Sequence, residues 1–378
     1  MSEPEILARV AAGAASFEAA DWDRCAGTAN PFTTHTFLAA LEDSGSVGPR
    51  TGWQPAPVAI DGAGGRPAAV MPAYVKSHSR GEYVFDHGWA DAYERAGGDY
   101  YPKLQIAVPF TPVPGRRLLA LEVALAPALI RAAEALVLQN EFSSAHATFI
   151  DPNEVELFER AHWLIRIDRQ FHWLNPGYSS FDDFLGSLSS RKRKAIRKER
   201  AGALDGLEVR LLRGAEIEEA HWDAFWDFYQ DTGSRKWGRP YLTRPFFSML
   251  GERMAERLLL VMAFRGDRPV GGALNLIGVD ALYGRYWGTL VEAPGLHFEL
   301  CYYQAIEFAI ANGLARVEAG AQGEHKLSRG YQPVPTFSAH FFADPRLRDA
   351  VADFLELERR AALREIAALG DFTPFRKA

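Results

Sequence analysis

The pattern of apolar and polar residues predicts the same order of elements twice along the chain. In the first half, "PVAID" (57–61) and "RPAAVMPAYVK" (66–76) flank a run of glycines and predict a hairpin. The elements expected next are a strand at 104–110, a helix at about 122–139, and strands at 145–150 and 163–168. Such a strand–helix–strand order predicts a parallel strand pair.

The second half repeats this order with little shared sequence. "LLLVMAF" (258–264) and "VGGALNLIG" (270–278) flank Gly266-Asp267-Arg268-Pro269 and predict a second hairpin. The elements expected next are a strand at 281–287, a helix at about 297–311, strands at 314–319 and 336–342, and a last helix. We therefore predict an α/β fold of two similar domains, each with a mixed, mostly antiparallel sheet and one βαβ unit.

The predicted boundary lies at "NPGYSS" (175–180), a turn-forming stretch between the two repeats. It separates residues 1–176 from residues 177–378. The second domain is expected to open with a basic helical segment at about 181–200. Two domains also fit the length, because single cores stop growing at about 250–300 residues.

Charge and cysteine content narrow the class of protein. Lys and Arg total 42 against 48 Asp and Glu, and the net charge of -6 argues against a protein that coats nucleic acid. Two cysteines in 378 residues do not make a disulfide framework, which fits the cytoplasm. The first residues contain acids and no long apolar run, so neither a secretory signal nor a transmembrane segment is predicted there.

One local stretch is strongly basic despite the negative total. Its cations are Arg191, Lys192, Arg193, Lys194, Arg197, Lys198 and Arg200, and Glu199 is the single acid among them. On a helix these positions surround the axis, so the segment is expected to be solvated. It is either a charged connector or a strip that binds the phosphates of tRNA or a nucleotide.

The stretch "VEAGAQGEHKLSRGYQP" (317–333) carries many unlike polar groups on a glycine-rich loop after an apolar strand. Glu318 either forms a buried ion pair with Arg285 or Arg329, or has its pKa raised toward that of a useful base. In the neighbouring strand 281–287, alternation places Tyr283, Arg285 and Trp287 on one face, and Leu282, Gly284 and Tyr286 on a core face. Arg285 is either a structural cation stacked between aromatic rings or a substrate-binding anchor for a carboxylate or phosphate.

Further candidates are less specific. His297, in the first turn of a largely apolar helix, is a candidate for lining the site. Arg235, Lys236 and Trp237 form a basic and aromatic mixture suited to a nucleotide or an anionic acceptor, or a packed loop. The aromatic-rich stretch 86–105 either covers a cleft or packs as a loop. The sequence shows no metal-ligand spacing, serine-hydrolase elbow or Walker loop, and no metal is expected.

The element order resembles that of the GNAT acyltransferase superfamily, and its duplication resembles the Fem-type aminoacyl and acyl transferases. Gly323, Lys326, Gly330 and Tyr331 in "GEHKLSRGYQ" resemble the Gly…Lys…Gly-aromatic signature of the second Fem-type domain. The resemblance implies an N-acyltransferase that uses acyl-CoA or aminoacyl-tRNA and a small-molecule or peptide amine acceptor.

Acyl transfer to an amine needs a base, donors for the developing oxyanion and an acid for the leaving group. We assign Glu318 or His325 as the base, Lys326 and Arg329 to hold donor or acceptor, and Tyr331 or Tyr286 as the acid. Neither half has the intact pyrophosphate loop of GNAT enzymes; Gly115, Arg116 and Arg117 are its nearest counterpart. The rival hypothesis is a non-catalytic ligand-binding or scaffold protein.

Overall fold

The computed structural model describes residues 7–236, 240–320, 323–372 and 374–376, and of residues 234–236 and 324 only the backbone. The chain divides into two compact units, residues 1–168 with 335–363 and residues 169–334 with 364–378. It passes from unit 1 to unit 2 inside strand β9 (Leu164–Leu174) and returns just after strand β15 (Gln332–Phe342) has begun. The first change of unit lies close to the predicted boundary at residue 176. The second lies inside the continuous strand β15, where the sequence has no turn-forming stretch to mark it.

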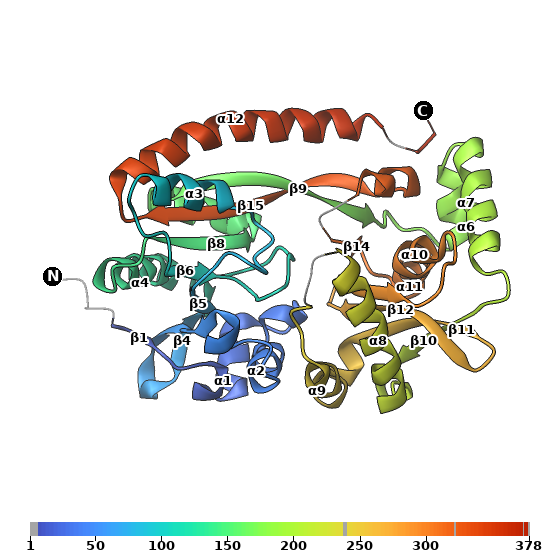
Figure 1. Ribbon diagram of the computed structural model, residues 1–378, viewed down its shortest axis with the longest axis horizontal. Helices are drawn as coiled ribbons and strands as arrows, with labels where there is room; N and C mark the ends of the chain where they lie inside the picture. Colours follow the sequence, from blue (N-terminus) through green and yellow to red (C-terminus); the bar gives the residue numbers. More distant parts are fainter. Residues whose placement is uncertain (1–6, 237–239, 321–322, 373, 377–378) are drawn as a thin grey trace. The chain divides into compact units, whose positions relative to one another are not determined.

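Unit 1 contains a sheet in the order β1-β3-β4-β7 and a ladder in the order β15-β8-β6-β5-β2 (Figure 1). Its strands are β1 (Ala8–Val10), β2 (Trp53–Pro55), β3 (Val58–Asp61), β4 (Pro67–Met71), β5 (Ala73–Lys76), β6 (Lys103–Ile106), β7 (Leu119–Ala120) and β8 (Ser144–Ile150). Its helices are α1 (Ala19–Ala26), α2 (His35–Asp43), α3 (His87–Arg95), α4 (Ala126–Gln139), α5 (Val155–Arg160) and most of α12 (Pro345–Gly370). The hairpin β3–β4 and the parallel pair β6–β8 are as predicted.

The core of unit 1 follows from helical spacing. Leu129, Ala133 and Val137 repeat every four residues on α4 and are buried against the strands of both sheets. On α12, Leu347, Val351 and Leu355 share the same spacing and pack with Trp89 of α3. Each helix thus buries one apolar stripe.

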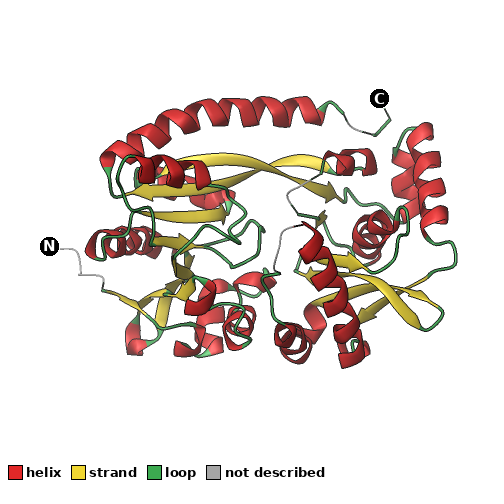
Figure 2. Cartoon of the chain, in the orientation of Figure 1, coloured by secondary structure: helices red, strands yellow, loops and turns green. Residues whose placement is uncertain are grey.

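Unit 2 has its strands in the order β10-β11-β12-β13-β14-β9. Figure 2 draws the strands in yellow and the helices in red. Its strands are β10 (Glu208–Arg213), β11 (Leu258–Arg265), β12 (Arg268–Ile277), β13 (Ala281–Thr289) and β14 (Arg316–Glu318). Its helices are α6 (Phe181–Ser187), α7 (Ser190–Ala203), α8 (Glu219–Lys236), α9 (Arg244–Met254), α10 (Leu296–Phe298) and α11 (Gln304–Ala311). The predicted hairpin β11–β12 and parallel pair β13–β14 are confirmed.

Helices cover both faces of the sheet of unit 2. Leu282, Val317 and Trp173 lie side by side on β13, β14 and β9 and join one core cluster with α6, α7 and α11. Helix α8 lies on the opposite face, where the backbone must approach closely. A Cβ at Gly288 would lie 2.1 Å from the carbonyl oxygen of Phe228 in α8, so glycine is required there.

The fold class is confirmed as α/β, with one parallel strand–helix–strand pair inside a mostly antiparallel arrangement in each unit. Some predicted bounds are wrong. β6 ends at Ile106 and not at residue 110, β9 continues to Leu174, and the helix expected at 297–311 contains a π-helical segment, Glu299–Tyr303.

Candidate active site

The parallel strands β13 and β14 stop pairing before β13 ends. They are in register from Ala281–Arg316 to Tyr283–Glu318, although β13 continues to Thr289. A β-bulge follows at once, because Asn275 pairs with Gly284 and Leu274 with Tyr286, which leaves Arg285 as the extra residue. Glu318 therefore stands at the point where the two strands separate.

The bulge reverses the faces predicted for the end of β13. Trp287 packs against the core cluster that contains Leu282, and its ring lies 4.5 Å from that of His297. Tyr286 contacts Tyr229 of α8 at 5.4 Å. The predicted faces of Tyr286 and Trp287 are wrong, because strict alternation assumes that no residue is inserted in the strand.

Glu318 is a buried carboxylate, 4% exposed, with one oxygen in an ion pair and one without a hydrogen bond. Arg316 Nε donates to its Oε1 at 2.8 Å. Its Oε2 has no hydrogen-bond partner within the described part of the chain. Burial raises the pKa of the Glu318 carboxyl, and the guanidinium of Arg316 opposes that shift. Arg285 also acts on this carboxyl electrostatically.

Arg316, His172 and Tyr283 surround Glu318 and were not predicted from the sequence. Tyr283 and His172 are the register neighbours of Glu318 on β13 and β9. His172 Nε2 lies 3.8 Å from Glu318 Oε2, and burial lowers the pKa of this imidazole to about 3, so it is neutral at pH 7. The same-face spacing of residues 316 and 318 was the one signal available.

Lys326 is a buried amine, 1% exposed. Its Nζ donates to the carbonyl oxygen of Gly320 at 2.7 Å. Burial lowers its pKa to about 7, and its charge helps to depress the pKa of His172. The structure thus brings both Glu318 and Lys326 within electrostatic reach of His172.

The rings of Trp287, His297, Phe298, Tyr302 and His325 contact one another beside this group. His325 is exposed and its Nε2 lies 3.0 Å from the hydroxyl of Tyr302. His297, half-buried in α10, belongs to the same ring cluster. The two predicted histidines are therefore neighbours, with ring centroids 6.1 Å apart.

Two other predicted residues are deeply buried. Tyr331 is 1% exposed, and burial raises its pKa well above the ordinary value. Arg329 donates to Glu199 at 2.7 and 2.8 Å and to the carbonyl oxygen of His325 at 2.8 Å. The guanidinium of Arg329 is therefore committed to protein groups.

Two further predicted binding residues lie at the end of α8. Arg235 and Lys236 are its last residues, but their side chains are not among those described, and Trp237 lies outside the described residues. Their assignment stays a prediction. Arg285 is half-buried at the bulge, with its guanidinium carbon 5.2 Å from the ring centre of Tyr286.

In unit 1, the residues expected to bind a pyrophosphate hold the protein backbone. Arg117 is 1% exposed and donates to the carbonyl oxygens of Thr148, Val113, Gly115 and Arg116. Arg116 donates to the carbonyl oxygens of Cys25, Leu118 and Ala120. A Cβ at Gly115 would lie 2.6 Å from the side chain of Asn30. These contacts favour a structural role for all three.

The basic segment forms α7, which has one buried and several solvent-facing sides. Ile196 is buried, Arg197 pairs with Asp182, and Arg200 pairs with Glu299 and Glu307. No hydrogen bond or ion pair joins the side chains of Arg191, Lys192, Arg193, Lys194 and Lys198 to other described residues.

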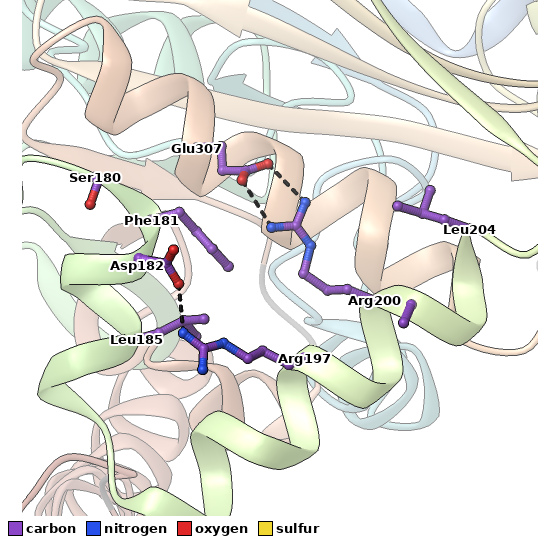
Figure 3. A pocket seen from close by; sticks show the side chains of 9 residues that line it. Ser180, Phe181, Asp182, Leu185, Arg197, Arg200, Leu204 and Glu307 are labelled. Atoms are coloured by element: carbon purple, nitrogen blue, oxygen red, sulfur yellow. Dashed lines mark hydrogen bonds and ion pairs between the residues drawn. The ribbon is translucent and has the colours of Figure 1, made fainter.

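A cavity of about 530 Å³ lies between α6 and α7, with Phe181, Arg197, Arg200 and Glu307 in its lining (Figure 3).

The described residues contain neither a candidate metal centre nor a candidate membrane span. No group of three or more His, Cys, Asp or Glu side chains there is arranged to hold a metal ion. In the same part of the chain, no helix combines the length and the apolar character needed to cross a bilayer.

The fold defines an α/β protein of two units, each with one parallel strand pair. The chain belongs to the FemAB_like family, described as peptidoglycan biosynthesis/recognition, whose model matches residues 13–377. Among curated proteins, none matches the chain.

Solved structures share the fold at low identity. The crystal structure of FemX has a TM-score of 0.54 at 11% identity, with 89% of this chain and 98% of that chain covered. L-PGS from Bacillus licheniformis has a TM-score of 0.50 at 8% identity, covering 93% and 99%. A conserved protein of unknown function from Bacteroides thetaiotaomicron has a TM-score of 0.53 at 12% identity, covering 89% and 100%.

Proposed function

We propose that the protein transfers an acyl or aminoacyl group from an activated donor, a thioester or an aminoacyl-tRNA ester, to an amine, and that unit 2 carries the chemistry. The observation that carries this proposal is Glu318. It is a buried carboxylate with a raised pKa and an oxygen without a hydrogen bond, at the point where two parallel strands separate. Perturbed carboxylates of this kind are suited to general base catalysis.

In the proposed step, the amine nitrogen attacks the carbonyl carbon of the donor and loses one proton to Glu318 Oε2. The new C–N bond forms and the C–S or C–O bond to the leaving group breaks. The departing thiolate or alkoxide takes a proton from a phenol. Tyr286 is better placed for this than Tyr331, because Tyr286 is half-buried whereas Tyr331 is 1% exposed.

Two cations support the developing oxyanion in this scheme. Arg285 lies close enough to Glu318 to affect its pKa, and Lys326 affects the neighbouring His172. A cation in a site of low dielectric stabilises negative charge on the carbonyl oxygen more strongly than it would in water. His325, exposed beside Tyr302, is the alternative base.

The identity of the donor is left open between acyl-CoA and aminoacyl-tRNA. The guanidinium groups of Arg116 and Arg117 donate hydrogen bonds to backbone carbonyl oxygens. These residues therefore do not fit the pyrophosphate of CoA. The unpaired cations of α7 are suited to the phosphates of tRNA. The family description supports an acceptor amine on a peptidoglycan precursor.

The second candidate function is a non-catalytic ligand-binding or scaffold protein. It is favoured by the ion pair between Glu318 and Arg316, which gives the carboxylate a structural use. Arg316 also pairs with Asp280, a carboxylate on the surface. Asp280 therefore provides a control, because its removal disturbs Arg316 without changing Glu318.

The test combines each donor, acetyl-CoA or alanyl-tRNA, with peptide amines and measures the thiol or deacylated tRNA released. Glu318→Gln is expected to lower turnover about 10²- to 10⁴-fold. Asp280→Asn removes the other carboxylate from Arg316 and should change turnover by no more than a few-fold. Full activity of Glu318→Gln, or equal losses in both variants, would assign Glu318 a structural role.

A further inference from the structure

Glu199 is the single acid among the cations of α7, and its side chain contacts two other segments of unit 2. Its two carboxylate oxygens accept from Arg329 Nη2 at 2.8 and 2.7 Å. The hydroxyl of Tyr303, in the π-helical segment, donates to its Oε1 at 2.6 Å. Glu199 therefore makes specific contacts within unit 2, unlike a charge that is only solvated.

Arg329 in turn holds the 3₁₀ turn Glu324–Arg329. Its Nη1 donates to the carbonyl oxygen of His325 at 2.8 Å. Its guanidinium carbon lies 3.4 Å from the centre of the Phe298 ring. With 6% exposure, the arginine has a fixed orientation as long as its charge is paired.

The turn carries both His325 and Lys326. Lys326 reaches the carbonyl oxygen of Gly320 from this turn, and His325 reaches Tyr302. A change in the orientation of Arg329 would therefore displace the two side chains that the site uses.

We propose that Glu199 is a positioning residue, which fixes the 3₁₀ turn through Arg329 and so presents His325 and Lys326 to the candidate active site. The inference rests on the proposed function for its catalytic meaning, but the positioning itself is measurable without it. Bidentate pairing of a guanidinium with a carboxylate provides the directional contact that such a role requires.

The neighbouring residue on α7 supplies a matched control. Arg200 makes equally short contacts, to Glu299 of the π-helical segment and to Glu307 of α11, and neither contact reaches the turn. Figure 3 shows the pair with Glu307. Glu307→Gln thus weakens the attachment of α7 and leaves Arg329 paired, whereas Glu199→Gln removes the charge that holds Arg329.

The first readout is the reactivity of Lys326 toward acetic anhydride, followed by mass spectrometry as a function of pH. In the parent protein, burial holds the pKa of Lys326 at about 7. Glu199→Gln is expected to shift the apparent pKa upward by at least about one unit, because a loosened turn admits water. Tyr303→Phe, which keeps the ion pair, should give a smaller shift in the same direction, and Glu307→Gln should give none.

The second readout is transfer activity. Glu199→Gln should lower kcat at least about tenfold with little change in KM, while Glu307→Gln retains kcat. An unaltered Lys326 profile in both Glu199→Gln and Tyr303→Phe would overturn the inference, whether or not the parent protein is active. If the variants shift the Lys326 profile but the parent protein transfers no acyl group, the positioning is supported and the proposed function is rejected. If Glu199→Gln does not fold, Tyr303→Phe decides alone.

Discussion

Lys103 Nζ donates to Glu82 Oε2 at 2.8 Å in unit 1, and both side chains are shielded from solvent. Lys103 also pairs with Asp86, whose carboxylate accepts from the hydroxyl of Tyr100 at 2.7 Å. Each of these buried charges depends on the others, because an isolated ion in a protein interior costs several kcal/mol.

Lys103→Met is therefore expected to destabilise the protein by about 3–5 kcal/mol, since it leaves the buried carboxylate of Asp86 without its lysine and Glu82 with only Lys76, whose Nζ lies 3.7 Å from Glu82 Oε1. Urea denaturation followed by circular dichroism measures the change. Lys198→Met, at an exposed position of α7, should stay within about 0.5 kcal/mol. A loss as small as that of the control would mean that the carboxylates are neutral in the folded state.

The buried imidazole of His172 predicts sensitivity to acid. Its pKa is lowered from 6.5 to about 3, chiefly by burial, so the unfolded chain binds a proton between these values and the folded protein does not. The stability contributed by neutral His172 is complete above pH 6.5 and falls by about 1.4 kcal/mol per pH unit toward pH 3.

His172→Gln should flatten this acid limb when free energies of unfolding are compared between pH 3 and 7. His87→Gln, at an exposed position of α3, should leave it unchanged. Parallel curves for the parent protein and His172→Gln would contradict the burial of a neutral histidine.

The close approach of α8 to β13 predicts opposite effects of two alanines. Gly288→Ala would drive a Cβ into the carbonyl of Phe228, and we expect a loss of about 1–3 kcal/mol as for other overpacked cores. Gly202, inside α7, has nothing within 4 Å of its added Cβ, so Gly202→Ala should stabilise by about 0.5–1 kcal/mol. Thermal unfolding of both variants tests the pair, and a stable Gly288→Ala protein would contradict this packing.

The solvent-facing cations of α7 predict binding to polyanions. Joint reversal of Lys192, Lys194 and Lys198 to Glu should weaken tRNA binding steeply and reduce the slope of log K against log salt by roughly 0.7–0.9 for each lost phosphate contact. Reversal of Arg265 and Arg268, exposed on the β11–β12 hairpin, tests whether negative charge added elsewhere in unit 2 has the same effect. Absence of binding by the parent protein at low salt would leave the helix a charged connector.

The sequence was sufficient for the elements whose signals are local. Both hairpins and both parallel pairs were predictable, because glycine-containing turns and apolar runs mark them directly. The bulge at Arg285 was not, since one inserted residue leaves no mark in the composition but exchanges the faces of Tyr286 and Trp287.

For the site, the residue types were recognisable but their partners were not. Glu318 was singled out as a carboxylate in an apolar strand, yet its partner is Arg316, two residues away on the same face, and not Arg285 or Arg329. The pairing of Glu199 with Arg329 spans 130 positions and has no local signal. The one indication in the sequence was that Glu199 is the single acid in a basic segment.

Strand β15 belongs largely to unit 1 although it is made long after the rest of that unit. The ribosome must synthesise residues 169–334 before the strand that pairs with β8 exists, which takes roughly ten to thirty seconds at about 5–20 residues per second. During that interval β8 has an open edge, and buried residues such as Ala145 and Ala147 lack their cover from Ala339 and Phe341. Nascent chains halted before residue 335 should therefore be clients of chaperones, whereas chains released after α12 should not.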